Sequence, residues 1–99
     1  MSDYQALRRR DRRLAILAFL SECAMYTSNG DVILSVLNET GNPSTRDELV
    51  TELWWLKEQG FVGVTDHEDF LVVDATQRGV EIAAGTARHP DVSRPRPRR

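Results

Sequence analysis

Residues 44–76 read STRDELVTELWWLKEQGFVGVTDHEDFLVVDAT and describe a helix followed by two short strands. Ser44 and Asp47 have the spacing of a capping-box variant, which predicts that the helix begins there. Leu49, Leu53 and Leu56 recur at intervals of four and three residues, so they share one face of the helix. We therefore expect a helix that runs to residue 60 and buries its leucine face.

Gly60 fits the left-handed position that often ends a helix. The runs after it, Phe61–Val64 and Phe70–Val73, are rich in β-branched and aromatic residues and predict two strands. The polar residues 66–69 predict the turn between them. A helix, a glycine and a hairpin in this order form the second half of a winged helix-turn-helix domain, which commonly lays its last core helix in a DNA groove.

The preceding sequence supplies the other core helices. Residues 4–22 and about 31–40 have helical apolar patterns, and residues 26–30 are turn-like, with room for a short first strand. A last helix is expected over residues 77–87, capped by Thr76 or Asp74.

The predicted fold class is α+β, mainly α: a winged helix-turn-helix with a three-helix core, a β-hairpin wing and a C-terminal helix. This domain should span residues 1–87. Residues 88–99 contain three prolines and no apolar pattern, so we expect a disordered basic tail.

Composition limits the class of protein. A chain of 99 residues with 40% hydrophobic residues has enough apolar surface for one small domain. It has neither an apolar run of about 18–20 residues, as a membrane span needs, nor a signal-peptide pattern. Its single cysteine, Cys23, excludes an internal disulfide, and we expect it to pack on the first helix. A cytoplasmic protein is therefore expected.

The formal net charge of −2 conceals a segregation of charge. Residues 1–13 have a net charge of +3, residues 88–99 have +4, and residues 14–87 have −9. Basic ends around an acidic centre favour a polyanionic partner, although a solvated helix face and an ordinary charged tail explain the pattern equally well. The predicted phosphate contacts are Arg8, Arg9, Arg10, Arg12, Arg13, Arg94, Arg96, Arg98 and Arg99.

The sequence contains no recognisable catalytic or metal-binding motif. Cys23, His67 and His89 are its only soft metal ligands, and their spacing matches no zinc motif. There is no nucleophile with a neighbouring base and no glycine-rich phosphate loop. We expect a protein that is not an enzyme and has no cofactor and no metal.

The helix over residues 44–60 has an acidic outer face. Counted in rotations of 100° about the helix axis from Leu49, the side chains predicted to point outward are Glu48, Thr51, Glu52 and Trp55. Carboxylates there would oppose DNA phosphates.

Thr45 and Arg46, at the tip of this helix, are the predicted base contacts, because an arginine fork can pair with guanine. Trp55 lies nearly opposite the leucine face and is expected to be exposed, whereas Trp54 should pack at the flank. Exposed tryptophans often anchor interfaces, so the candidate protein interface is Trp55, Thr51 and Glu52. Alternatively, the first helix or the tail folds over Trp55.

Three segments resemble a known family. They are RDRRLAIL at residues 10–17, TRD at 45–47 with LWWLKEQGFV at 53–62, and TQRGVEIAAG at 76–85. Together they are similar to a small winged-helix family of Mu-like phages and prophages, often labelled as similar to arsenic-repressor-type regulators. The resemblance covers nearly the whole chain and implies a phage origin and a site in the bacterial host cytoplasm. It supplies no functional residues.

The sequence thus predicts a non-enzymatic winged-helix DNA-binding protein, encoded by a phage or prophage and acting as a transcriptional regulator. Its expected partner is double-stranded DNA, with a second copy of the chain or a phage protein as further partners. The alternative is a winged-helix module for protein interaction, phage assembly or DNA packaging, which would use the acidic, tryptophan-bearing helix face.

Overall fold

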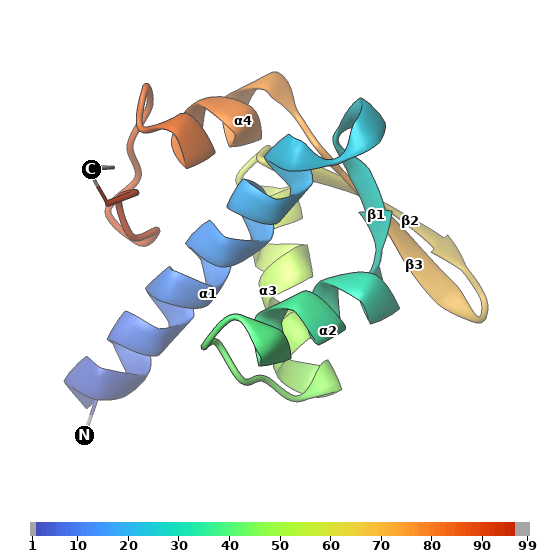
Figure 1. Ribbon diagram of the computed structural model, residues 1–99, viewed down its shortest axis with the longest axis horizontal. Coiled ribbons are helices and arrows are strands. Elements are labelled where there is room, and N and C mark those ends of the chain that lie inside the picture. Colours follow the sequence, from blue (N-terminus) through green and yellow to red (C-terminus); the bar gives the residue numbers. More distant parts are fainter. Residues whose placement is uncertain (1, 97–99) are drawn as a thin grey trace.

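The computed structural model describes residues 2–96, in which four α-helices pack with one three-stranded antiparallel sheet (Figure 1). The chain is mainly helical, and the α+β class is confirmed. The elements are α1 (Ser2–Glu22), a 3-10 turn (Ala24–Tyr26), β1 (Thr27–Asn29), α2 (Gly30–Glu39), α3 (Arg46–Glu58), β2 (Val62–His67), β3 (Phe70–Ala75) and α4 (Gln77–Ala84).

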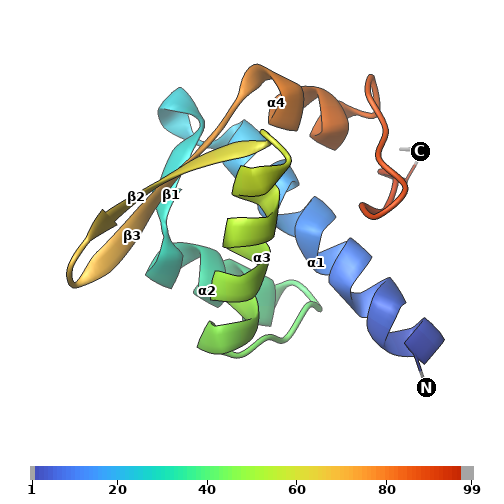
Figure 2. The ribbon, with the colours of Figure 1, turned by 180° about the vertical axis from the view of Figure 1, so that it is seen from behind.

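The arrangement of these elements separates two sides of the molecule. Seen from behind, α3 lies between α1 and the sheet, and the β2–β3 hairpin projects on one side of it (Figure 2). On the other side, α4 and the tail after it lie beside α1. The hairpin and the tail are therefore at opposite ends of the domain.

The sheet has the strand order β1–β3–β2. Strands β2 and β3 pair from Val62 opposite Ala75 to His67 opposite Phe70. Both strands are longer than predicted, and the expected turn over residues 66–69 shrinks to two residues. The chain reverses so tightly because Glu68 adopts a left-handed conformation with φ of 54°.

The core confirms the predicted leucine face of α3. Leu49, Leu53 and Leu56 are buried. Burial of this stripe is what holds the small domain together, because each such side chain stabilises it by roughly 1.5–3 kcal/mol. The other members of the core come from every major element and are Ile16, Leu17, Leu20, Ile33, Leu37, Phe61, Val62, Val73, Ala75, Ile82 and Val92.

The N-terminus of α3 lies one residue later than predicted. Its cap is Thr45, whose side chain accepts the Glu48 N–H at 3.1 Å, while the Glu48 carboxylate accepts the Thr45 N–H at 3.0 Å. This reciprocal capping box lowers the pKa of the Glu48 carboxyl through that backbone hydrogen bond. Ser44 does not cap the helix; its hydroxyl accepts a hydrogen bond from Arg12 Nε at 2.7 Å.

The C-terminal helix is shorter than predicted. Thr76, one of the two predicted caps, accepts the Gly79 N–H and donates to the carbonyl of Gly60. The helix ends at Ala84 because Gly85 takes the left-handed C-terminal position with φ of 83°.

The tail follows a defined path as far as it is described, which differs from the predicted disorder. Val92 is buried in the core, Ser93 N–H donates to the carbonyl of Arg10 at 3.2 Å, and Arg13 donates to the carbonyl of Asp91 at 3.0 Å. One apolar side chain and these hydrogen bonds are enough to hold residues 88–96 on the domain, so the boundary expected at residue 87 is not seen. Residues 97–99 lie outside the described residues.

Gly79 should not tolerate a larger residue. A Cβ atom there would lie 2.1 Å from the carbonyl oxygen of Phe61, which is backbone and cannot rotate away. Overpacking of this kind costs about 1–3 kcal/mol or more and should outweigh the helix-propensity gain of about 1 kcal/mol. We expect Gly79→Ala to lower the urea midpoint, whereas the exposed neighbour Gln77→Ala should leave it nearly unchanged. Equal midpoints would contradict the close packing of α4 on residue 61.

Candidate functional site

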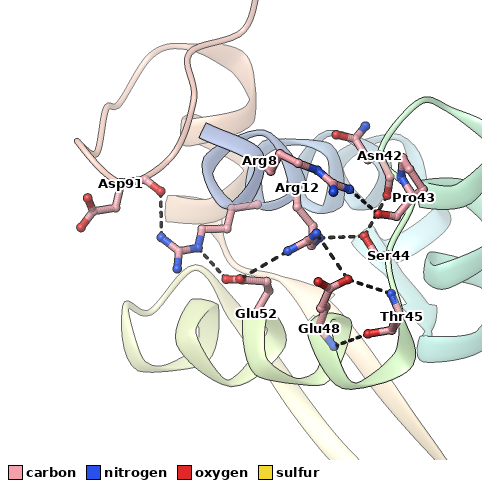
Figure 3. Close-up of polar contacts among 10 residues, drawn as sticks. Arg8, Arg12, Asn42, Pro43, Ser44, Thr45, Glu48, Glu52 and Asp91 are labelled. Carbon is pink, nitrogen blue, oxygen red and sulfur yellow. Dashed lines mark hydrogen bonds and ion pairs between the residues drawn. The ribbon is translucent and has the colours of Figure 1, made fainter. Parts of the chain in front are cut away.

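A buried ion network connects α1 to α3 (Figure 3). Only 2% of Glu52 is exposed. Its carboxylate accepts a hydrogen bond from Arg13 Nε at 2.6 Å and lies 3.8 Å from Arg12 Nη1. The prediction that Glu52 faces solvent is therefore wrong, as is the prediction that Arg12 is a free phosphate contact. The physical reason is that residues 49, 52, 53 and 56 form one continuous stripe, and α1 covers its flank.

The network extends to the loop before α3 and to the tail. Arg8 donates to the carbonyl of Pro43 at 2.6 Å, and Arg12 lies 3.6 Å from the Glu48 carboxylate. Arg13 reaches the carbonyl of Asp91 with its second nitrogen. Three of the five predicted N-terminal phosphate contacts are thus engaged within the domain, where they position its segments (Figure 3).

The two tryptophans have the opposite arrangement to the predicted one. The guanidinium carbon of Arg13 lies 3.8 Å from the Trp55 ring centroid, and the rings of Phe61 and His89 pack edge-on at 6.4 and 5.3 Å. Trp55 is therefore half-buried under α1 and the tail, as the alternative interpretation expected, and is unsuited as an exposed anchor. Trp54 is 41% exposed instead.

The other arginines of the two basic ends form no ion pairs among the described residues. They are Arg9, Arg10, Arg88, Arg94 and Arg96. Arg94 and Arg96 line a groove between α1 and the α2–α3 loop, residues 40–42. The predicted contacts Arg98 and Arg99 lie outside the described residues.

The predicted base contacts at the tip of α3 are both occupied. The Thr45 hydroxyl caps the helix, and Arg46 pairs with Asp31 on α2, with both side chains exposed. Thr51 is exposed on the same helix. Of the two predicted base contacts, Thr45 is used by the helix cap, and Arg46 would have to leave Asp31 before it could contact another group.

A second groove lies between α3 and the β2–β3 hairpin. The exposed Trp54 and Phe70, the latter 44% exposed, contribute aromatic surface to it. No local pattern in the sequence predicts these two residues as a pair, because only the folded chain brings the hairpin end beside α3. The remaining lining residues are Arg46, Val50, Asp66, Glu68, Asp69 and Leu71.

This α3–hairpin groove is acidic. Within residues 2–96, the carboxylates of Asp66, Glu68 and Asp69 form no ion pair, and the only cation in the lining, Arg46, is held by Asp31. A groove with this charge repels phosphate and attracts cations.

The part of the chain that the structure describes contains neither a candidate metal-binding cluster nor a candidate membrane-spanning helix. No group of three or more His, Cys, Asp or Glu side chains there is placed to hold a metal ion. Over the same residues, no helix combines the length and the apolar character needed to cross a membrane. Cys23 is half-buried and donates to the carbonyl of Phe19 at 3.3 Å, and burial raises the pKa of its thiol.

Comparison with known proteins identifies a class of phage protein. The chain is 40% identical over 88 residues to the uncharacterized protein gp26 of Escherichia phage Mu, covering 89% of this chain and 91% of gp26. It is also 37% identical over 76 residues to an uncharacterized protein of Haemophilus influenzae, covering 76% and 74% of the two chains. No family model and no solved structure matches. The chain belongs to the family of Mu-like phage proteins that includes gp26.

Proposed function

We propose that this protein is a non-enzymatic winged-helix DNA-binding protein that acts as a phage-encoded transcriptional regulator in the host cytoplasm. The element order supports the winged-helix assignment: α2 and α3 are joined by a short loop, and the β2–β3 hairpin follows α3 directly. In that fold, the last core helix and the hairpin are the usual elements of DNA contact.

The charge distribution argues for phosphate contacts away from α3. The hairpin carries Asp66, Glu68 and Asp69, which would face the phosphates in the usual docking mode and weaken it. The observation that carries the proposal is instead the set of arginines without ion pairs near the tail, above all Arg94 and Arg96 beside the α2–α3 loop. They would hold the DNA backbone next to the helix-turn-helix.

Recognition of the DNA sequence would then depend on Arg46. Its pair with Asp31 is exposed, and exposed ion pairs stabilise by only about 0–1 kcal/mol. A bidentate contact with guanine is worth about 1–3 kcal/mol. Exchange of Asp31 for a guanine edge is therefore favourable once the arginines of the tail hold the duplex nearby.

Duplex DNA titrated across a salt series tests this proposal. With about four to six phosphates engaged, log affinity should fall with log salt at a slope of roughly −4 to −5, from about −0.9 per phosphate. Replacing Arg94 and Arg96 together with glutamine should reduce the slope by about 2. Arg78→Gln, an exposed arginine on α4 whose guanidinium lies over the Phe61 ring, is the matched control and should leave the slope unchanged. An Arg94 and Arg96 double variant with unaltered slope and affinity would exclude this surface.

The second candidate function is a protein-interaction module in phage assembly or DNA packaging. The α3–hairpin groove favours it, because exposed aromatic side chains with an acidic rim are typical of recognition surfaces for cationic peptides. Trp54, in place of the predicted Trp55, would be the anchor of such an interface.

A further inference from the structure

We propose that the α3–hairpin groove binds an arginine–proline peptide segment, and that its occupant is the C-terminal segment of a second copy of this chain, residues 97–99. This interaction is separate from DNA binding and would make the protein self-associate head to tail. The proposal follows from three features: the chemistry of the groove, the chemistry of the segment, and their positions in the fold.

The groove combines apolar contact surface with uncompensated negative charge. The ring of Trp54 and the ring of Phe70 are both partly exposed there, on α3 and at the end of the hairpin. The ring of His67 stacks on Phe70 at 5.2 Å and stiffens the hairpin end. Lys57 Nζ already lies 5.5 Å from the Trp54 ring centroid, so that ring has a cation beside it. The site thus offers aromatic faces with three carboxylates around them.

An arginine–proline segment matches both properties. Proline-rich peptides adopt an extended polyproline II conformation before binding and dock against aromatic side chains at small entropic cost. Guanidinium groups stack on aromatic rings and pair with carboxylates. A lysine could satisfy the charge, but it lacks the planar surface for stacking. The groove therefore favours arginine and proline together over cationic residues in general.

The chain ends in such a segment. Its last six residues read RPRPRR and contain four arginines, two prolines and no acidic residue. The first three of them are placed on the domain, since Arg94 and Pro95 line a cavity with α4 and Arg96 lines the groove beside α1. Residues 97–99 therefore remain as the occupant, and the charge of Arg98 and Arg99 complements that of Asp66, Glu68 and Asp69.

The geometry requires that the occupant come from another molecule. Residues 88–96 lie on the side of α1 away from the hairpin (Figures 1 and 2). Three further residues reach at most about 11 Å, whereas the domain measures 36 × 31 × 26 Å. A tail that cannot reach its own groove but fits it by charge creates a contact between two different surfaces of neighbouring copies, which closes as a reciprocal dimer or a ring, or continues as a filament.

Two linked measurements test this inference. Sedimentation velocity at low salt, without DNA, should show concentration-dependent association of the wild-type chain. That association should be lost in a chain that ends at Arg96, a change that removes no described residue. In parallel, a labelled RPRPRR peptide should bind the shortened chain, with affinity at least tenfold weaker in Trp54→Ala and in the Asp66→Asn, Asp69→Asn double variant.

Control variants and peptides distinguish specific binding in the groove from nonspecific attraction between opposite charges. Glu58→Gln removes an exposed carboxylate of α3 that does not line the groove and should leave peptide affinity unchanged. A KPKPKK peptide should bind more weakly than RPRPRR, and thermal melting should confirm that Trp54→Ala remains folded. Each variant retains Arg94 and Arg96, so failure here is distinguishable from failure of the DNA titration.

Three results would overturn the inference. Equal binding of the peptide to wild type and to the groove variants would exclude the groove. Undiminished association of the chain that ends at Arg96 would exclude the tail as occupant. Peptide binding in the groove by a wild-type chain that stays monomeric at high concentration would exclude a second copy and point to a different arginine–proline protein.

Discussion

Glu52→Ala is expected to destabilise the domain by about 3–5 kcal/mol, the usual effect of removing one partner from a buried ion pair. The carboxylate of Glu52 is the shared partner of Arg12 and Arg13. Without it, two largely buried guanidinium groups keep their desolvation cost and lose their nearest countercharge. The free energy of unfolding from urea titration measures the effect.

Two variants make this result specific. Glu58→Ala removes an exposed carboxylate from the same helix and should change stability by no more than about 0.5 kcal/mol. Glu52→Gln keeps an oxygen that accepts from Arg13 Nε and should fall between wild type and Glu52→Ala. If Glu52→Ala proved as stable as Glu58→Ala, the network would have no structural role.

A double-mutant cycle measures the coupling directly. In the combined Arg13→Ala, Glu52→Ala variant, neither charge of the closest pair remains unpaired. The double variant should therefore be less destabilised than the sum of the two single variants, with an interaction energy of about 0.5–3 kcal/mol. Additive effects would contradict the 2.6 Å contact between these side chains.

Leu53→Ala should destabilise the domain by about 2–5 kcal/mol. Leu53 is fully buried at the centre of the leucine face of α3, in contact with a core to which α1 and the sheet both contribute. For a chain of this size, such a loss corresponds to a fall in melting temperature of at least about 8 °C. Calorimetry or far-ultraviolet circular dichroism measures it.

The matched control is Leu7→Ala on α1. Leu7 was one of the apolar positions of the first helix, but it is 44% exposed, so the same chemical change creates no cavity there. We expect an effect within about 0.5 kcal/mol. Similar losses for the two variants would mean that residue 53 is not in the core and that the helical phase of α3 is wrong.

Strong local signals in the sequence predict several elements of the fold. The leucine period of α3 requires one buried face, and that face was predicted correctly because 3.6-residue periodicity is a property of the chain alone. The β-branched runs pair as a hairpin for equally local reasons. Gly85 ends α4 through a local signal as well, which the predicted end at residue 87 overlooked. The acidic character of the hairpin end, on which the proposed peptide-binding groove depends, is also evident from residues 66–69 alone.

Tertiary structure decided which charged and aromatic side chains remain accessible. Glu52 lies three residues after Leu49, about 60° from it around the helix, so the periodicity already puts it at the edge of the leucine face and the outward prediction was an error; α1 covers that edge and supplies the two arginines that pair with Glu52. The same helix, together with His89 of the tail, covers Trp55 and leaves Trp54 exposed.

The path of the tail was decided in the same way. The cap of α3 has a local cause instead, because Thr45 and Glu48 have the spacing of a complete capping box. Val92 anchors a proline-rich segment that has no apolar pattern of its own. Local spacing fixes the direction of a side chain relative to its own helix. Which segment packs against that side chain depends on contacts between residues that are tens of positions apart in the sequence. Such contacts decide whether an arginine near the N-terminus is free to bind phosphate or is paired with a buried carboxylate.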